Sequence, residues 1–237
     1  SIQTNPAPEP VNTEIAAQLT FIDPDSGDLH TVEWDWGDGE SSVGIVDEEG
    51  KTATGEHVYV SPGVYKITAT VTDSWGKSSS YEYLYKVIYD PEGGFVTGGG
   101  WFYSPAGSLA SDASIEGKAS FGFISKYQKG ANIPTGSTEF QFKAGNLNFN
   151  STSYDWLVIA GAKAQYKGTG VINGSGEYKF ILTAVDGQVP GGGGNDKIRI
   201  KIWNKYTDQL IYDNKIGAED SELPSTELGG GSIVIHN

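Results

Sequence analysis

The stretch that decides the fold is "WDWGDG", residues 34–39, in which two tryptophans flank an aspartate and a Gly-Asp-Gly follows. Side chains alternate between the two faces of a β-strand, so Trp34 and Trp36 share one face. The Gly-Asp-Gly has the chemistry of a tight turn, because glycine accepts positive φ and aspartate hydrogen bonds its own backbone. We therefore predict a strand that ends in a turn, with both indoles inside a sandwich.

An acidic active site is the alternative interpretation of the same stretch. Glu33 and Asp35 share the other face of the predicted strand. Glycoside hydrolysis needs two carboxylates that face each other across a cleft. Neighbours on one strand imply no cleft, so the strand and turn are favoured.

The same alternation recurs along the chain, and clusters of Gly, Asn, Asp and Ser separate the segments that carry it. The segments "EFQF" and "EYKFILTAV" follow this pattern, and no convincing amphipathic helix is found. Period 2 predicts half-buried strands, so we expect an all-β chain built of sandwiches. Two segments place their apolar residues on one face: Tyr65, Ile67, Ala69 and Val71 in "YKITATVTD", and Ile198, Ile200 and Ile202 in "KIRIKIW".

Composition and charge narrow the class of protein. The 237 residues are 37% hydrophobic and 12% aromatic, which supports a packed core in one large or two ordinary domains. No apolar run approaches the roughly 18–20 residues of a membrane helix. The net charge is −14, which disfavours nucleic acid and anionic lipid as partners. Neither a starting Met nor a signal peptide is seen, so we expect part of a longer protein.

Cysteine is absent, which excludes disulfides, thiolate catalysis and Cys-ligated metal. Secreted eukaryotic domains usually carry disulfides. An extracellular location therefore points to a bacterial or archaeal surface protein, in which bound calcium can replace the missing covalent links.

The domain organisation is expected to be two domains in tandem. Residues 1–10 are proline-rich and predict a linker. The stretch "YDPEGG", residues 89–94, has turn chemistry and cannot continue a central strand. We predict a first domain over 11–90, a short linker at 91–94 and a second all-β domain over 95–237.

The segment "HVYVSPGVYKITATVTDSWG", residues 57–76, joins WDWGDG in a combination that resembles a PKD domain. The resemblance covers about residues 11–90 and implies an Ig-like β-sandwich with Trp34 and Trp36 in its core. It implies that His57 packs or hydrogen bonds within the motif. It implies no catalysis, because PKD modules are spacers, interaction modules or occasional binders of a substrate surface.

The acids of the loop "DPDSGDLH" are candidate metal ligands. The loop is not an EF-hand, since Gly27 precedes Asp28 and no Glu closes position twelve. The resemblance to calcium-binding PKD domains implies a Ca²⁺ site that this loop forms with the aspartate of the TVTD motif. Solvated turn acids are the alternative. The candidate ligands are Asp23, Asp25, Asp28 and Asp73.

The second domain runs from "VTGGGWFYSPAG" to "LGGGSIVIH". It resembles an all-β domain that follows PKD modules near the C-termini of large bacterial and archaeal extracellular proteins. This resemblance implies a larger sandwich or a jelly-roll-like fold and carries little information about activity. Its glycine runs lack the Gly-Lys-Ser/Thr ending of a phosphate loop, so turns or close backbone approaches are expected.

Two sets of residues in the second domain are candidate sites. Acids beside the glycine loop and after a neighbouring strand could share a cation, or they could be ordinary hairpin residues. Aromatic residues near turns could stack on sugars, although core packing is the alternative. The acids are Asp186, Asp196 and Asp213, and the aromatic residues are Trp101, Tyr103, Trp203 and Tyr206.

The sequence contains few residue patterns that are typical of a catalytic site. The three histidines, His30, His57 and His236, lie in distant segments without H-E-x-x-H spacing, and no G-x-S-x-G motif occurs. We therefore expect a non-catalytic structural, adhesion or spacer segment of an extracellular or cell-surface prokaryotic protein, stiffened by calcium. A carbohydrate-binding module and an accessory region of a secreted hydrolase are the alternatives. Expected partners are neighbouring domains of a larger chain, a polysaccharide or a surface protein.

Overall fold

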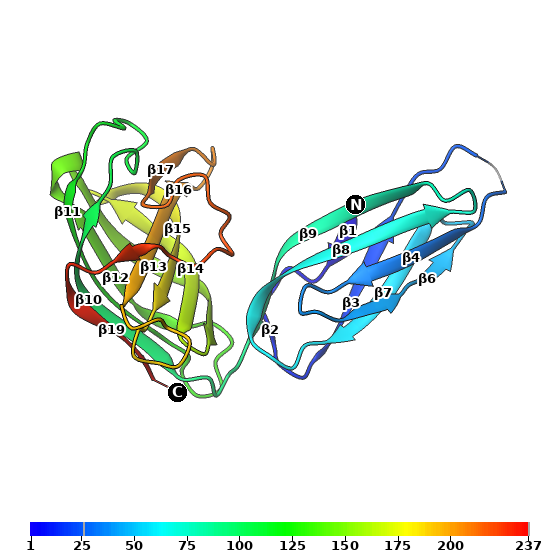
Figure 1. Cartoon of the computed structure of the whole chain (residues 1–237), viewed down its shortest axis with the longest axis horizontal. Helices are drawn as coiled ribbons and strands as arrows, with labels where there is room; N and C mark the ends of the chain where they lie inside the picture. The colour runs from blue at the N-terminus through cyan, green and yellow to red at the C-terminus, as the bar shows by residue number, and fades with distance from the viewer. Residues whose placement is uncertain (26, 237) are drawn as a thin grey trace. The chain divides into compact units, whose positions relative to one another are not determined.

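The chain folds into two compact units, Ser1–Tyr89 and Asp90–Asn237 (Figure 1). The structure is a computed structural model that describes residues 1–25 and 27–236, so Ser26 of the acidic loop lies outside the described residues. Apart from the short 3₁₀ helix η1 (Lys143–Gly145), the regular elements of these residues are strands, which confirms the all-β prediction. No helix in this described part has the length and apolarity to cross a membrane.

The first unit is a sandwich of two sheets around one core. Strands of this unit alternate buried with exposed residues, as period 2 predicts. One sheet has the order β1 (Ile2–Thr4), β3 (Glu14–Thr20), β7 (Thr52–Val58), β6 (Ile45–Asp47). The other has the order β2 (Glu9–Pro10), β9 (Ser78–Tyr89), β8 (Gly63–Asp73), β4 (His30–Asp35), β5 (Ser41–Val43).

The predicted linker at residues 1–10 is wrong, because this segment belongs to the first sandwich. Strand β1 pairs with β3, and β2 pairs in parallel with β9. The buried ammonium of Lys86 holds the segment through the carbonyl of Asn5 at 2.9 Å and the carboxylate of Glu9 at 3.2 Å. The prolines suggested an unpaired chain, but Pro10 lies in an edge strand, where proline is tolerated.

The tryptophans of WDWGDG lie in the core of the first unit. Trp34 and Trp36 are both 0% exposed, and their ring centroids are 5.4 Å apart. The ring of His57 stacks on Trp36 at 5.0 Å, and its Nε2 lies 2.7 Å from the Asp38 carboxylate. The hydroxyl of Tyr59 donates to the carbonyl of Trp36 at 2.7 Å. The predicted core role of both indoles and the packing role of His57 are confirmed.

The turn after β4 has the predicted chemistry. The carboxylate of Asp35 accepts the backbone N–H of Gly37 at 2.9 Å, and Asp38 accepts that of Glu40 at 3.1 Å. Gly37 has φ +80, and a Cβ there would lie 2.4 Å from the carbonyl oxygen of Lys66, so this position requires glycine. Asp35 therefore supports a turn on an exposed strand face.

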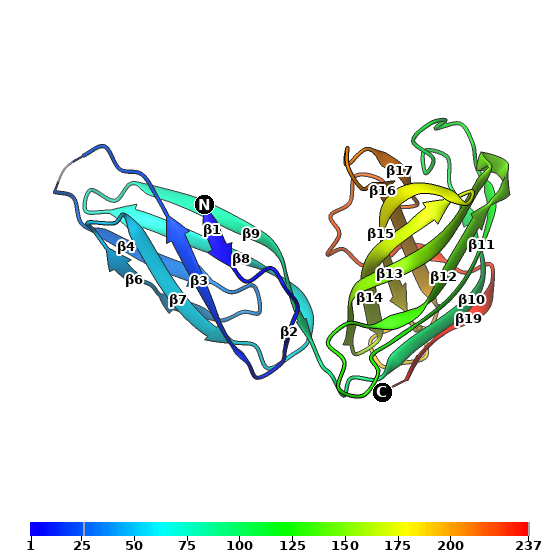
Figure 2. The same cartoon turned by 180° about the vertical axis from the view of Figure 1, so that it is seen from behind.

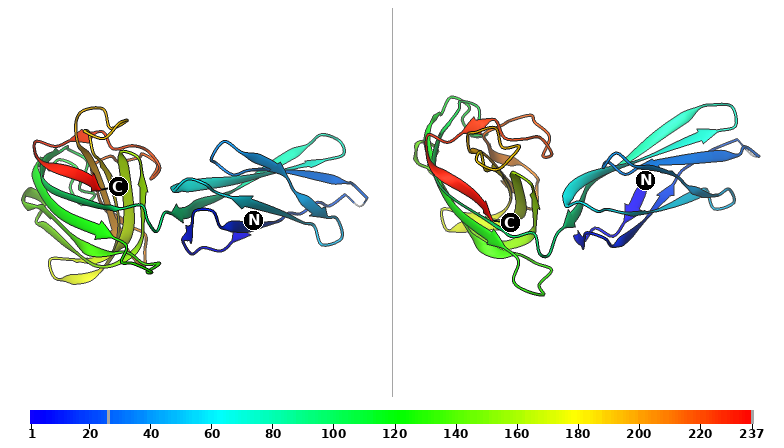
Figure 3. Two further views of the ribbon diagram at one scale, coloured as in Figure 1. Left: turned by 90° about the horizontal axis from the view of Figure 1, so that it is seen from below. Right: turned by 60° about the horizontal axis from the view of Figure 1, so that its bottom comes forward.

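The second unit is one antiparallel sheet that rolls over itself (Figures 2 and 3). Its halves face each other as the layers of a sandwich do, but the strands follow mostly in sequence, which differs from the Greek keys of a jelly roll. The order is β17 (Leu210–Asp213), β16 (Lys197–Asn204), β15 (Ser175–Val185), β14 (Lys163–Ile172), β13 (Leu147–Ala160), β12 (Thr135–Phe142), β11 (Gly117–Lys126), β10 (Phe95–Ser104), β19 (Gly230–His236), with β18 (Thr226–Glu227) beside β16.

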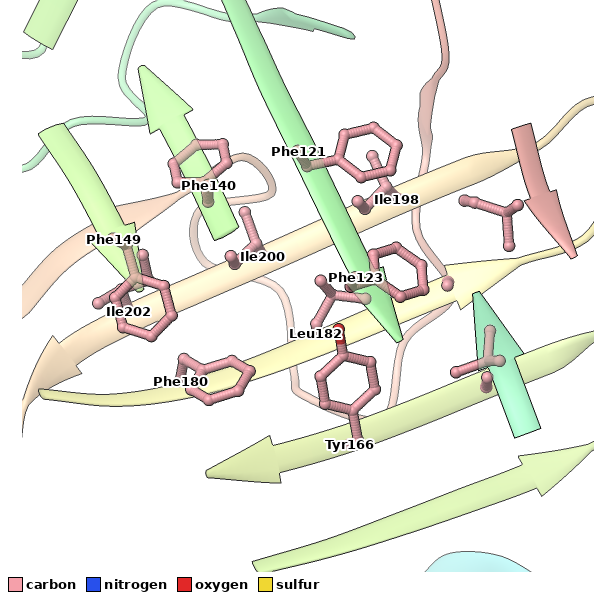
Figure 4. Packing of buried hydrophobic residues seen from close by; sticks show 14 of the residues in the cluster. Phe121, Phe123, Phe140, Phe149, Tyr166, Phe180, Leu182, Ile198, Ile200 and Ile202 are labelled. Carbon is pink, nitrogen blue, oxygen red and sulfur yellow. The ribbon is translucent and has the colours of Figure 1, made fainter. Parts of the chain in front are cut away.

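The inner faces of the rolled sheet enclose a single core (Figure 4). Phe121 and Phe123 of β11 point toward Ile198 and Leu182, which come from the opposite half of the sheet. The ring of Phe123 is 5.8 Å from that of Tyr166 on β14. The predicted apolar face of "KIRIKIW" is confirmed, since Ile198, Ile200 and Ile202 are all fully buried.

The outer face of β14 to β16 is also covered. Residues 214–225, here called the covering segment, connect β17 to β18. Side chains of the sheet donate to its carbonyls: Arg199 to Ala218 at 2.9 Å and to Glu219 at 2.7 Å, Gln165 to Asp220 at 2.7 Å and Lys163 to Ser221 at 3.3 Å. The outward-facing residues of these strands are therefore largely buried, and Trp203 at the end of β16 is half-buried.

Candidate functional site

The acidic loop of the first unit and the end of β8 meet at one pole. Asp23, Asp25 and Asp73 line a depression of about 240 Å³ there. Asp28 is absent from this lining, and its carboxylate accepts the indole N–H of the exposed Trp75 at 3.2 Å. Three of the four predicted ligands are therefore brought together.

Protein groups already engage these carboxylates. Asp73 accepts the backbone N–H groups of Trp75 at 2.9 Å and Lys77 at 2.8 Å. Asp23 accepts the backbone N–H of Asp25 at 3.0 Å. Among the described residues, no group of three or more His, Cys, Asp or Glu side chains is arranged to hold a metal ion. Calcium binding at this pole stays a prediction.

His30 lies between two carboxylates beside this pole. Its Nε2 is 2.9 Å from Asp23 and its Nδ1 is 2.8 Å from Glu48, while its side chain is 3% exposed. The backbone N–H of Asp25, followed by the charge of His30, holds the pKa of Asp23 below its ordinary value. Burial acts to raise the pKa of Glu48, but hydrogen bonds from His30 outweigh it and the pKa is lowered. This triad ties the acidic loop to the sandwich.

Two of the predicted cation ligands in the second unit support its last strand instead. Asp186 accepts the backbone N–H of Ile235 at 2.9 Å, and Asp196 accepts that of Ile233 at 2.7 Å. These amides lie on the side of β19 that no strand of the described residues occupies. An unpaired buried N–H is costly, so the two carboxylates replace the missing neighbouring strand.

The third predicted ligand, Asp213, forms a buried ion pair. Nε and Nη2 of Arg199 donate to its two oxygens at 3.0 and 2.8 Å. Both side chains are at most 3% exposed. Asp213 is therefore engaged by a guanidinium, and a shared cation with Asp186 and Asp196 stays a prediction without geometric support in the described residues.

The four predicted aromatic residues form two separate groups. Trp101 and Tyr103 lie on β10, whereas Trp203 lies at the end of β16 and Tyr206 in the turn that follows it. The inner faces of β10 and β16 share one core, so their outer faces point in different directions. Tyr103 and Tyr206 are exposed and the two tryptophans are half-buried. One site cannot use all four rings.

Each aromatic group has charged neighbours. The ammonium of Lys118 lies 4.5 Å from the ring centroid of Trp101. A hydrogen bond to Glu116 raises the pKa of Tyr103. At the other group, the hydroxyl of Tyr206 donates to Glu177 at 2.8 Å, which raises the pKa of the phenol. Tyr206 is thereby fixed in place although it is exposed.

A row of polar side chains, here called the polar ladder, extends from Trp101 across the outer face of β11 to β13. The register places Trp101 beside Ser120, Ser120 beside Gln141, and Gln141 beside Asn148. A second row contains Gly122, Glu139 and Asn150. The ladder lines a depression of about 370 Å³, formed by Ser120, Phe121, Gly122, Glu139, Gln141, Asn148 and Asn150.

The polar ladder has unused hydrogen-bonding capacity. Within the described residues, no protein group hydrogen bonds to the side chains of Gln141, Asn148 or Asn150. Other amides are occupied: Gln165 donates to Thr183 and Asp220, and Asn214 donates to Ile198. Sequence reasoning missed this row because each member lies on a different strand. Alternation within each strand and the strand order together could have found it.

The geometry defines an all-β protein with an Ig-like two-sheet unit followed by a rolled antiparallel sheet. Residues 4–87 match a family model described as PKD domain, so the first unit contains a PKD domain. This agrees with the resemblance found in the sequence.

Similarity to other known proteins is slight. No curated protein matches the chain. One solved structure, described as concerning the promiscuous specificity of carbohydrate-binding modules from the β-sandwich superfamily, is 16% identical in sequence. The alignment covers 99% of this chain and 90% of that chain with a TM-score of 0.31, which is too low to support an inference about this chain.

Proposed function

We propose that the chain is a non-catalytic segment of an extracellular or cell-surface prokaryotic protein, in which the PKD domain is a spacer and the second unit serves display or adhesion. The PKD match at residues 4–87 is the observation that carries this proposal. The residues of its motif support it, because Trp34, Trp36 and His57 are used in packing. The lack of cysteine agrees with a prokaryotic surface location.

The arrangement of the histidines favours a non-catalytic role. His30 and His57 each pair with carboxylates inside the first unit, and His236 stacks on Phe95 at 4.0 Å in the second. Among the hydrogen bonds of the described residues, only His236 has a serine or threonine hydroxyl as a partner. Its Nε2 lies 3.4 Å from the hydroxyl of Thr97. That distance is long for a nucleophile and its base.

A second candidate function is carbohydrate binding at the polar ladder. Amide side chains both donate and accept, which matches sugar hydroxyls, and the half-buried indole of Trp101 lies at one end with the ammonium of Lys118 over its ring. The free amides of Gln141, Asn148 and Asn150 beside Trp101 favour this candidate. Among the described residues, no comparable row of free amides lines the depression beside Trp203.

One experiment separates these two functions. The chain is incubated with a panel of insoluble neutral polysaccharides, in calcium and in EDTA, and bound protein and released reducing ends are measured. A spacer or display segment remains in the supernatant. If the ladder binds glycan, the chain is retained, and Trp101→Ala or a Gln141→Ala, Asn150→Ala pair weakens retention about tenfold, equivalent to about 1.4 kcal/mol.

The controls locate the site and test the non-catalytic role. Trp203→Ala removes an aromatic residue of the other group and leaves ladder binding unchanged. Loss of retention in EDTA alone would show that binding requires calcium. Equal retention in both buffers would show that binding does not depend on calcium. Release of reducing ends in proportion to protein would contradict a non-catalytic segment.

A further inference from the structure

The second unit contains a cavity of about 540 Å³ away from the ladder. It lies where the β13–β14 turn, the loop between β15 and β16 and the covering segment meet. This volume is within the range of about 300–1,000 Å³ typical of small-molecule sites. No residue predicted from the sequence as a site lines it.

The cavity is mainly apolar. Val185 and Pro224 are buried in its lining, and Leu223 forms an exposed part of its rim. The glycine-rich loop between β15 and β16 forms one side of the cavity. Its backbone packs closely on itself there, since a Cβ on Gly192 would lie 2.0 Å from the carbonyl oxygen of Asp186. The lining residues are Ala160, Gly161, Ala162, Lys163, Val185, Pro190, Gly191, Gly192, Gly193, Lys197, Leu223 and Pro224.

Two lysines supply the charge of this cavity. Lys163 and Lys197 are the cross-strand partners of Val185 on its two sides. Neighbouring strands are about 4.8 Å apart, so the two backbones are about 10 Å apart and both long side chains can reach one ligand group. Burial lowers the pKa of Lys163, which reflects its partly desolvated ammonium.

Neither lysine has an acidic partner. Among the described residues no salt bridge reaches either ammonium, although Glu227 is the cross-strand neighbour of Lys197. The ammonium of Lys163 donates to the Ser221 carbonyl at 3.3 Å. A chain of net charge −14 thus presents two cations, unpaired by carboxylates, at an apolar cavity.

We propose that this cavity binds a small organic carboxylate with a compact apolar body. The carboxylate lies between Lys163 and Lys197, and the apolar body packs against Val185, Leu223 and Pro224. A phosphate fits less well, because the N–H groups of Gly192 and Gly194 already donate within the glycine loop and form no anion cradle. This inference is independent of the proposed function.

The test compares three probes of one shape and different charge: cyclohexanecarboxylate, cyclohexylmethanol and cyclohexylmethylamine. Each is titrated into the full ¹⁵N-labelled chain, and the amide signals of Ala162, Val185 and Gly193 are followed. Cyclohexanecarboxylate is expected to bind at these amides about tenfold more tightly than the alcohol, and the amine more weakly than either.

Variants assign the contributions. Lys163→Gln and Lys197→Gln each weaken cyclohexanecarboxylate about three- to tenfold and leave the alcohol unchanged, because only a charged contact is lost. Leu223→Ser weakens the carboxylate and the alcohol alike, and its exposed position spares the fold. Lys143→Gln, in η1 at the other end of the strands, is the matched control.

The proposal is overturned if the three probes bind alike, if both lysine variants bind the carboxylate as the wild type does, or if the responding amides lie elsewhere. Because retention on polysaccharide uses different side chains, failure here leaves the ladder experiment unaffected. The amide spectrum also shows whether each variant is folded.

Discussion

The two units close their β-structure in different ways. In the first, two separate sheets meet over apolar and aromatic side chains, and the side chains of Lys86 and His30 are buried beside carboxylates. In the second, one sheet rolls over itself and buries Asp186, Arg199 and Asp213. A rolled sheet still has edges and a covered outer face, and their polar groups must be satisfied from distant parts of the sequence. Burial of charge is therefore part of closing the second unit.

The largest expected difference between the two units comes from disrupting the buried ion pair of the second unit. Arg199→Leu leaves Asp213 as an unpaired buried carboxylate, which should destabilise the second unit by about 3–5 kcal/mol. Guanidinium chloride unfolding of the full chain, followed separately by NMR signals from each unit, measures this change. The denaturant midpoint for unfolding of the first unit should not change.

Two control variants sharpen that result. The double variant Arg199→Leu, Asp213→Leu should recover part of the loss, because no charge remains buried without a partner. Lys66→Ala removes one side of an exposed pair with Glu82 in the first unit and should cost less than about 1 kcal/mol. Equal effects of Lys66→Ala and Arg199→Leu would remove the distinction between the units.

The second prediction concerns the edge of β19. Asp196→Ala removes the acceptor of the Ile233 N–H and should cost about 1–3 kcal/mol, and Asp186→Ala should do the same through Ile235. Within β19, hydrogen exchange should accelerate most at the amide that lost its acceptor. The Val234 amide, which alternation turns toward β10, is the internal reference.

The exposed Asp155 provides the matched control, since Asp155→Ala removes a carboxylate from the same unit without uncovering an amide. Unchanged exchange at Ile233 and Ile235 in the two aspartate variants would mean that the edge does not need these carboxylates.

The smallest expected effect is the acid response of the first unit. The folded pKa values of Asp23 and Glu48 lie below their ordinary values of 3.8 and 4.5. Their contribution to stability is therefore present above those values and is lost as pH falls through the lower folded pKa values. Between about pH 5 and pH 3, the melting temperature of the first unit should fall more in the wild type than in Asp23→Asn, Glu48→Gln.

The exposed carboxylate of Glu56 on β7 provides a comparison for this pH series. Glu56→Gln should show the wild-type acid response. Parallel curves for the wild type and the Asp23, Glu48 double variant would show that the His30 contacts contribute nothing to acid sensitivity.

The sequence predicted what local alternation controls. The burial of Trp34 and Trp36, the apolar face of Ile198 to Ile202 and the turn after β4 follow from period 2 and turn chemistry, and the structure confirms them. The role of Arg199 did not follow. Alternation turns it away from the core, and the covering segment that buries it has no periodic pattern.

Long-range pairing explains the other differences. Residues 1–10 have the composition of a linker, yet strand partners 13 to 79 residues away in sequence hold them in the sandwich. Asp186 and Asp196 have the sequence context of hairpin turns, and one oxygen of each accepts a backbone N–H of their own loop. The other oxygen of each accepts a backbone N–H of β19, which the local sequence does not indicate. The polar ladder likewise depends on which strands become neighbours, which no single segment specifies.

The pairing of Phe95 with His236 has a mechanical consequence. The first and last strands of the second unit start and finish at one corner, so tension applied through these two residues peels β10 from β19 one pair of hydrogen bonds at a time. Peeling resists force less than sliding strands past each other, because few bonds carry the load at any moment. Such a unit suits a domain that is attached at one point better than a domain that transmits tension between its two neighbours.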